Sequence, residues 1–216
     1  MKQYSISQTI CKNVKTVDSR EPLVNLALYS KVIAIGIGET SRRALKLKPG
    51  ACFVRESVAK RLAKAQSYLP KGLHLKIESS YRPLSVQIKI QKQFLREVKR
   101  RNPKISDEQA NLEVDKWVAN PKKVIPPHST GGAIDLTIVS DKGEELDMGS
   151  SDDSMTPKSW TNARISKLAR KNRNILIYVM SRAGFANYKR EWWHWSYGEW
   201  GWAYANNRKS AIYGII

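Results

Sequence analysis

The chain has 216 residues, of which 41% are hydrophobic and 26% are charged, so it is long and apolar enough for one globular domain spanning residues 1–216. Its most apolar uncharged stretches, PLVNLALYS and VIAIGIG, are far shorter than the roughly 20 residues that cross a bilayer. A protein inserted in the membrane is therefore excluded.

The charge is strongly basic, because 38 Lys and Arg against 19 Asp and Glu give a net charge of +19. Such a surplus attracts polyanions such as nucleic acid, anionic lipid or an anionic wall polymer. The other interpretation is a lysine-rich solvated surface. The N-terminus lacks the apolar run of a signal peptide, so we expect a cytoplasmic protein, or a periplasmic one if a leader was removed. Cys11 and Cys52 allow one disulfide at most, and their spacing fits no metal motif.

The first half of the chain predicts a helix, a strand and two more helices. Residues 57–69 have apolar side chains at helical spacing, and residues 73–81 alternate between apolar and polar, as in a half-buried strand. After Pro83, residues 85–101 predict a strongly basic helix. The sequence SDEQ at 106–109 has the form of a capping box. It predicts a further helix running to about Val118.

The second half predicts a strand, a long helix and an extended segment. Residues 131–140, GGAIDLTIVS, alternate so that Asp135 lies on the less apolar face. A helix is predicted from Thr161 to the AGF sequence, where Gly184 suits the position after its last residue. Residues 185–198 are rich in aromatic side chains and predict a strand. Few strands and grouped helices favour the α+β class.

The glycine pair before the second strand offers the first candidate site. Gly131 and Gly132 let the chain turn tightly, so that His128 and Asp135 can point to the same place. A histidine seven residues before an aspartate also occurs often by chance. On this pair alone, a structural histidine beside a structural aspartate is the simpler interpretation.

The sequence EWWHW at 191–195 offers the second candidate. Glu191 and His194 would face opposite sides of a regular strand, so they converge only if the strand bends. A metal would give a reason for such a bend. Two imidazoles and a carboxylate, here His128, Asp135 and His194, are a common zinc set, and Glu191 would then be the general base. The alternative is a buried structural pair inside a cluster formed by Trp192, Trp193 and Trp195, which we expect to alternate between core and pocket.

Two further segments could contribute charge. Arg82 follows a predicted strand and precedes Pro83, so its guanidinium is held where it can be aimed at an oxyanion or a carboxylate. Among so many basic residues, an ordinary surface arginine is the simpler interpretation. The acidic loop LDMGSSDD at 146–153 could bind a substrate ammonium through Asp152 or Asp153, or could cap the next helix.

Together, the segments SSYRP, PPHSTGGAIDLTI, LDMGSSDD and EWWHW, in this order and spacing, resemble the zinc D-alanyl-D-alanine dipeptidases of the vancomycin-resistance type. These enzymes are part of the wider D,D-peptidase metallopeptidase family, and the resemblance extends over roughly residues 20–200. The family pattern H-x-x-G-x-A-x-D, followed by a late E-x-x-H, is matched by His128, Gly131, Ala133, Asp135, Glu191 and His194.

The resemblance implies a role for each matching residue. His128, Asp135 and His194 would hold one zinc ion per chain, and Glu191 would be the catalytic acid and base. Arg82 would stabilise the transition state, and Asp153 would contact the amino end of the dipeptide. The implied fold is one domain with a small, mostly antiparallel central sheet flanked by helices, and with the zinc site at one edge of the sheet.

The implied function is hydrolysis of the D-alanyl-D-alanine dipeptide to free D-alanine, with zinc-bound water activated by Glu191 and with Arg82 stabilising the oxyanion. A D,D- or L,D-carboxypeptidase acting on peptidoglycan stem peptides is the related alternative. The alternative from another class is a basic nucleic-acid-binding protein, although the sequence contains no recognisable motif for one. The expected partner is a small D,D-dipeptide, with weak attraction to anionic wall polymers and without nucleic acid.

Overall fold

The computed structural model describes residues 1–5, 8–37, 50–152, 154 and 156–216. Within these residues, the centre is a six-stranded sheet with the strand order β1-β8-β9-β7-β6-β4. Its strands are β1 (Gln3–Tyr4), β4 (Ala34–Ile35), β6 (Leu73–Ser79), β7 (Ala133–Ser140), β8 (Ala186–Tyr188) and β9 (His194–Ser196). The three inner pairings are antiparallel and the two outer pairings are parallel. The predicted α+β class is therefore confirmed.

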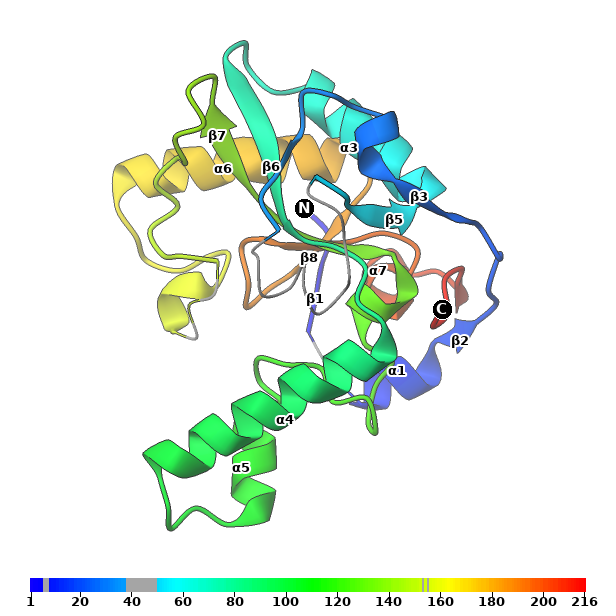
Figure 1. The fold of residues 1–216 in the computed structure, drawn as a ribbon, viewed down its shortest axis with the longest axis vertical. Coiled ribbons are helices and arrows are strands. Elements are labelled where there is room, and N and C mark those ends of the chain that lie inside the picture. The colour runs from blue at the N-terminus through cyan, green and yellow to red at the C-terminus, as the bar shows by residue number, and fades with distance from the viewer. Residues whose placement is uncertain (6–7, 38–49, 153, 155) are drawn as a thin grey trace.

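Helices and shorter strands surround this sheet (Figure 1). The helices are α1 (Gln8–Asn13), α3 (Glu56–Ser67), α4 (Leu84–Arg101), α5 (Asp107–Val114), α6 (Lys167–Arg182) and α7 (Trp200–Ala205). Short 3-10 helices are η1 (Leu26–Leu28), η2 (Pro127–Thr130) and η3 (Pro157–Ser159). Two small sheets pair β2 (Lys15–Thr16) with β10 (Ser210–Ala211) and β3 (Leu23–Asn25) with β5 (Phe53–Arg55).

The main core lies between one face of the sheet and the helices α3 and α6. Strand β7 contributes Ile134, Leu136 and Ile138 to this core, and all three are completely buried together with apolar residues of both helices. Because side chains alternate along a strand, Asp135 must point to the opposite face. The alternation predicted from the sequence thus decides on which side of the sheet a polar site can form.

Helices α4 and α5 form an arm that projects from the rest of the molecule (Figure 1). The predicted capping box is present, because the Ser106 hydroxyl accepts from the Gln109 N–H and the Gln109 side chain accepts from the Ser106 N–H. Helix α5 ends at Val114, however, and not near Val118 as predicted. Beyond it the backbone forms turns, because the Lys116 and Trp117 N–H groups donate to the carbonyls of Glu113 and Val114, three residues earlier.

Helix α6 also differs from the prediction at one end. It begins at Lys167 and not at Thr161, because the Ser166 hydroxyl caps it by accepting from the Ala169 N–H at 3.0 Å. Its other end agrees with the prediction, since Gly184 has a φ of +89° directly after the last helical turn. The residues directly before Lys167 are therefore non-helical and connect α6 to η3.

Cys11 and Cys52 are both buried and free, so the one disulfide that the sequence allowed does not form. Burial raises the pKa of the Cys52 thiol to about 11. Among the described helices, none is both long and apolar enough to span a bilayer.

Candidate metal centre

The glycine turn before β7 brings His128 and Asp135 together. Gly131 has a φ of +72°, a backbone conformation that residues with a side chain rarely adopt. Gly132 lies so close to the backbone that a Cβ atom there would be 2.5 Å from the Tyr197 carbonyl oxygen. With this turn in place, His128 Nε2 lies 3.2 Å from Asp135 Oδ2.

A second turn brings Glu191 beside His194. Residues 185–198 form two strands joined by a turn, and not the single strand that the aromatic composition predicted. The Glu191 N–H donates to the Tyr188 carbonyl at 3.0 Å, and the His194 N–H donates to the Glu191 carbonyl at 3.3 Å. Buried Asn187 closes the turn by donating its side-chain amide to the carbonyls of Glu191 and His194. The two residues therefore converge because the chain reverses, and not because a strand bulges.

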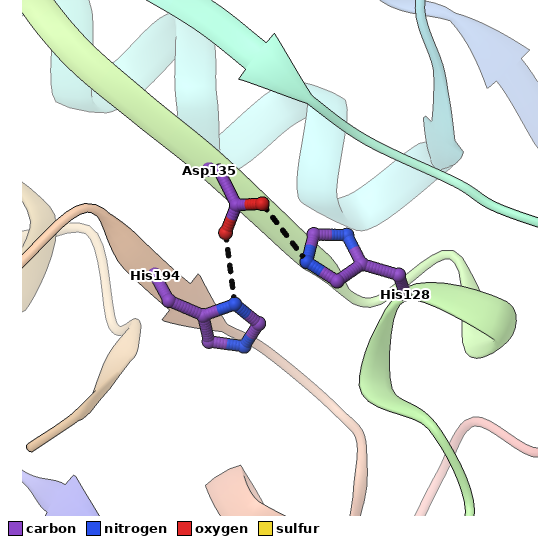
Figure 2. A group of neighbouring side chains, drawn as sticks. All are labelled: His128, Asp135 and His194. Atoms are coloured by element: carbon purple, nitrogen blue, oxygen red, sulfur yellow. Dashed lines mark hydrogen bonds and ion pairs between the residues drawn. The ribbon is translucent and has the colours of Figure 1, made fainter. Parts of the chain in front are cut away.

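The structure brings the three predicted metal ligands together (Figure 2). Asp135 on β7 and His194 on β9 are directly paired across the two strands, and their Oδ1 and Nδ1 atoms are 2.9 Å apart. One ligand atom from each of His128, Asp135 and His194 lies within 4.8 Å of the others, and all three residues are buried. The expected position at an edge of the sheet is wrong, because β7 and β9 are inner strands of the sheet.

Hydrogen bonds to the two histidine rings determine which ring nitrogen of each histidine faces the Asp135 carboxylate. His128 Nδ1 lies 2.9 Å from the Ser80 carbonyl. A carbonyl can only accept, so Nδ1 carries the proton and Nε2 has a free lone pair. His194 is turned the other way, with Nδ1 facing Asp135 and Nε2 lying 3.4 Å from the Ser196 hydroxyl. That hydroxyl is also 2.7 Å from the Tyr4 hydroxyl. Such outer contacts orient histidine ligands in metal sites.

The charge states of His128 and Asp135 also suit a cation. Burial, followed by the nearby charge of Arg82, lowers the pKa of His128 to about 4, so its imidazole is neutral near pH 7. Burial alone would raise the pKa of Asp135, but its contacts with His128 and His194 lower it well below the ordinary range. Burial likewise opposes the charge on His194, but Asp135 raises its pKa overall. An ionised carboxylate between two imidazoles is a donor set that a divalent metal fits.

Glu191 is close to this set but outside it. Its Oε2 lies 3.8 Å from His194 Nδ1, longer than a hydrogen bond. Burial, with a further contribution from the charge of Asp135, raises the pKa of Glu191 to about 8. A buried carboxyl group with so high a pKa beside a cation site is suited to taking and returning a proton.

Arg82 contributes a fixed positive charge at the same place. Its Nη2 donates to Asp135 Oδ2 at 3.1 Å, and Nε and Nη2 both donate to the Ser79 hydroxyl, at 3.1 and 2.9 Å. Its Nη1 donates to the side-chain oxygen of buried Gln87 at 3.3 Å. The guanidinium therefore has one orientation, which is what a group facing developing charge requires.

The site opens into a cavity of about 420 Å³. The sheet, with Arg82 and the ligand group, forms one side of it, and Phe94 of α4 and residues 117–119 form another. Asp152 and Ser154 line it as well, whereas Asp153 lies outside the described residues.

The tryptophans follow the predicted alternation only in part. Trp193 lines the cavity, whereas Trp192 and Trp195 are not among its lining residues, and all three belong to the buried core.

Several residues that hold the site in place were missed by the sequence analysis. Gln87 and Asn187 could have been suspected, because each places an amide among apolar neighbours in a predicted helix or strand. Ser79 stands in the SSYRP motif and has no distinguishing signal of its own. Tyr4 reaches the site from the first strand, and nothing in the local sequence marks it.

Comparisons with known proteins agree with the motifs. A family profile described as D-ala-D-ala dipeptidase matches residues 37–211. The chain is similar to the D-alanyl-D-alanine dipeptidase of Synechocystis sp., with 33% identity over 109 residues, 42% of this chain and 44% of that protein. It is also similar to the enzyme of the same name from Enterococcus faecalis, with 38% identity over 90 residues, 41% of this chain and 43% of that protein. The matched segments thus span less than half the length of these relatives.

Two solved structures are also similar to the chain. VanYB in complex with D-Alanine-D-Alanine has a TM-score of 0.46 and 17% identity, covering 74% of this chain and 82% of that one. A vancomycin-resistance D,D-pentapeptidase VanY in complex with Zn(II) has a TM-score of 0.46 and 17% identity, covering 90% of this chain and 92% of that one.

Proposed function

The chain belongs to the D-ala-D-ala dipeptidase family, and on that premise we propose that it hydrolyses D-alanyl-D-alanine to two molecules of D-alanine. The observation that carries the proposal is the buried group formed by His128, Asp135 and His194, whose ligand atoms lie within 4.8 Å of one another. Glu191 stands 3.8 Å from this group, where a proton acceptor is needed. The same residues match the motif of the family.

His128, Asp135 and His194 would hold one zinc ion per chain, with His128 Nε2 and His194 Nδ1 as the nitrogen atoms nearest the shared carboxylate. Three protein ligands of this kind are typical of catalytic zinc, whereas structural zinc usually takes four. A bound zinc ion supplies Lewis-acid chemistry, polarising a carbonyl and making water more acidic. The hydrogen bond from His128 Nδ1 to the Ser80 carbonyl supports this assignment, because it leaves Nε2 free to coordinate.

Glu191 moves the proton. It takes one from the attacking water as the new C–O bond forms, and it delivers that proton to the leaving amine nitrogen as the C–N bond breaks. Its raised pKa, about 8 in the metal-free protein, supports this role because a general acid and base works best with a pKa near the working pH. The turn closed by Asn187 keeps the carboxylate in place between the two steps.

Arg82 stabilises the negative charge that develops on the carbonyl oxygen, and its fixed hydrogen bonds to Ser79 and Gln87 reduce the reorganisation that this requires. An acidic group of the loop that contributes Asp152 to the cavity would hold the substrate ammonium. The family pattern assigns this contact to Asp153.

The size of the cavity favours a second candidate, a D,D-carboxypeptidase acting on longer stem peptides. A volume of about 420 Å³ lies in the range of pockets that hold drug-sized ligands. A dipeptide with two methyl side chains would leave part of it unfilled, next to the apolar wall formed by Phe94 and Val118.

The test is release of free D-alanine from D-Ala-D-Ala by zinc-loaded protein. Matched reactions use L-Ala-L-Ala and a stem peptide that ends in D-Ala-D-Ala. We expect cleavage of the dipeptide, its loss on chelation and its return with added zinc. Glu191→Gln keeps the shape of the side chain and should lower kcat by about 10²- to 10⁴-fold, which is the usual contribution of a general base.

Each other outcome has a definite meaning. Cleavage of the stem peptide alone would establish the carboxypeptidase instead. A Glu191→Gln variant as active as the parent chain would remove Glu191 from the reaction. If zinc-loaded protein cleaves none of the three substrates, the proposed activity is wrong.

A further inference from the structure

Arg173 of α6 is a completely buried arginine whose side chain binds one loop. Its Nε, Nη1 and Nη2 each donate to a backbone carbonyl at 2.7 Å, and the three carbonyls are those of Met148, Trp160 and Lys158. Among the described residues, no carboxylate lies within ion-pair distance of its guanidinium. A buried cation held mainly by carbonyls is costly, so its position calls for an explanation beyond packing.

The loop held by Arg173 is also hydrogen-bonded to the turn between β8 and β9, which contains Glu191. The Trp192 N–H donates to the Ser159 carbonyl at 2.9 Å, and the Ser159 hydroxyl shares its one proton between the carbonyls of Thr156 at 2.7 Å and Arg190 at 2.9 Å. The Thr161 N–H also donates to the Lys189 carbonyl, at 3.1 Å. The backbone on both sides of Glu191 is therefore tied to residues 159–161, and Arg173 binds the carbonyl of Trp160 within this segment and that of Lys158 just before it.

Two further contacts link Arg173 to this turn. Its guanidinium lies 5.5 Å from the ring centre of Trp192, the residue directly after Glu191. The indole N–H of Trp192 donates to the Ser150 hydroxyl at 3.1 Å, and Ser150 belongs to the loop that begins beside the Met148 carbonyl. The Thr161 hydroxyl also donates to Asn187, which closes the turn from the other side.

We propose that Arg173 is a positioning residue for Glu191, fixing residues 158–161 so that this segment holds the Glu191 carboxylate beside the metal ligands. The inference rests on the proposed hydrolase function. The planar guanidinium is suited to the task, because its fork reaches three carbonyls at once. A lysine ammonium at the same place is a single point charge and cannot span Met148, Lys158 and Trp160 together.

The experiment compares zinc-loaded Arg173→Lys with the parent chain on D-Ala-D-Ala. A small displacement of a catalytic group can cost about 10²-fold in rate. We therefore expect kcat to fall by roughly 10- to 100-fold, while KM and the zinc content per chain stay close to the parent values. A raised KM with unchanged kcat would overturn the proposal and indicate that Arg173 acts on the cavity wall near Asp152. Loss of zinc would overturn it too, because the effect would then lie in the ligands.

A double-mutant cycle separates positioning from a general structural role. If Arg173 acts through the Glu191 carboxylate, then Arg173→Lys should lower kcat in the parent chain but leave the residual rate of Glu191→Gln unchanged. The same fold loss in both backgrounds would mean that Arg173 supports the site without acting through Glu191, and the proposal would fail.

Arg182→Lys is the matched control on the same helix. Its guanidinium lies over Tyr68 and donates to the Tyr178 hydroxyl at the surface, away from the loop. This variant should retain the parent kcat, and a loss equal to that of Arg173→Lys would overturn the proposal. The parent chain is assayed in the same series, so absence of dipeptide cleavage there refutes the proposed function separately.

Discussion

The strands that carry the site and the arm formed by α4 and α5 differ sharply in burial. Seven of the eight residues of β7 are buried, whereas Gln87 is the one fully buried residue among the 18 of α4. Each candidate ligand and Glu191 has neighbouring backbone that is hydrogen-bonded on several sides. The comparison indicates that the chemistry lies on the fixed part of the molecule, as a site that tolerates little misplacement requires. The arm provides a wall and, through Gln87, a hydrogen-bond acceptor that helps to orient Arg82.

The two regions also differ in charge. Helix α4 has one acidic residue, Glu97, and six basic ones, which are Lys89, Lys92, Arg96, Lys99, Arg100 and Arg101. Among the described residues that line the cavity, Arg82 is the one lysine or arginine, and it stands with four carboxylates, those of Glu78, Asp135, Asp152 and Glu191. The basic surplus of the chain is thus carried partly by the arm and hardly at all by the cavity.

The largest expected effect comes from removing one of the three candidate metal ligands, which belong to the buried part of the molecule. His128→Ala leaves two of three ligands, so we expect loss of bound zinc at micromolar metal and a fall in activity of more than about 10³-fold. His74→Ala is the matched control, since His74 pairs with Asp141 at the surface of the same sheet. Zinc content and D-alanine release are the two measurements. Full activity in His128→Ala would contradict the assignment of His128.

Chelation should destabilise the parent chain, because a ligand that binds only the folded state adds to its stability. At a thousandfold excess over Kd the gain is about 4 kcal/mol, which for a chain of this size shifts Tm on the order of 10 °C. Thermal unfolding with and without chelator measures it. His128→Ala should show little of this difference. An equal shift in that variant would place the metal elsewhere.

Asn187→Ala should destabilise the turn between β8 and β9 without removing a ligand side chain. It removes two donors, to the carbonyls of Glu191 and His194, and leaves the Thr161 hydroxyl without its acceptor. We expect a loss of about 2–4 kcal/mol in the free energy of unfolding, measured by urea denaturation, together with a lower kcat. Asn174→Ala, at an exposed position of α6, should change neither quantity by much. A similar loss in both variants would refute the role given to the turn.

Phe94→Ala tests whether the arm contacts substrates that are longer than a dipeptide. Loss of this partly buried ring should cost roughly 1–2 kcal/mol of apolar contact with a substrate long enough to reach it. KM for a stem peptide should then rise about 5- to 30-fold, with the dipeptide unaffected. Leu112→Ala, which is 54% exposed on α5, is the control. An equal change for both substrates would place Phe94 at the dipeptide itself.

The smallest effect on catalysis is expected from reversing the charge of the arm. Lys89, Lys92 and Arg96 are all exposed on α4, and changing the three to Glu should leave kcat and KM for the zwitterionic dipeptide within about twofold, because exposed charges are screened at physiological salt. Retention on an anionic resin should fall with this change. A large loss of dipeptide cleavage would show that the arm acts on the site electrostatically.

Much of the fixed side was predictable because its signals are local. The alternation in β6 and β7 and the glycine pair before Asp135 specify the strands and the turn from neighbouring residues alone. The EWWHW sequence indicated Glu191 and His194, and the family pattern gave them the same roles. The turn between β8 and β9 was not predicted, because aromatic composition favours a strand, while the reversal depends on Asn187 reaching the carbonyls of residues further along the chain.

Contacts between distant segments account for what was missed elsewhere. Arg173 occupies a helical position that looks like any other basic one, and its burial follows only from the loop that folds over it. Helix α6 begins late because Ser166 caps it, although the serine was visible in the sequence. Tyr4 comes beside Ser196 through the pairing of β1 with β8, which no local pattern announces.

The direct pairing of Asp135 with His194 across β7 and β9 has a consequence for how the protein is made. A chain that has not yet assembled its sheet has only His128 and Asp135 near each other, and His194 arrives 59 residues after Asp135. A slip of one residue between these strands would turn His194 to the wrong face, and such a chain could not capture the ion. Metal uptake therefore discriminates correctly assembled molecules from misassembled ones, so a zinc-responsive dye added during refolding would report the final step of folding and not the first collapse.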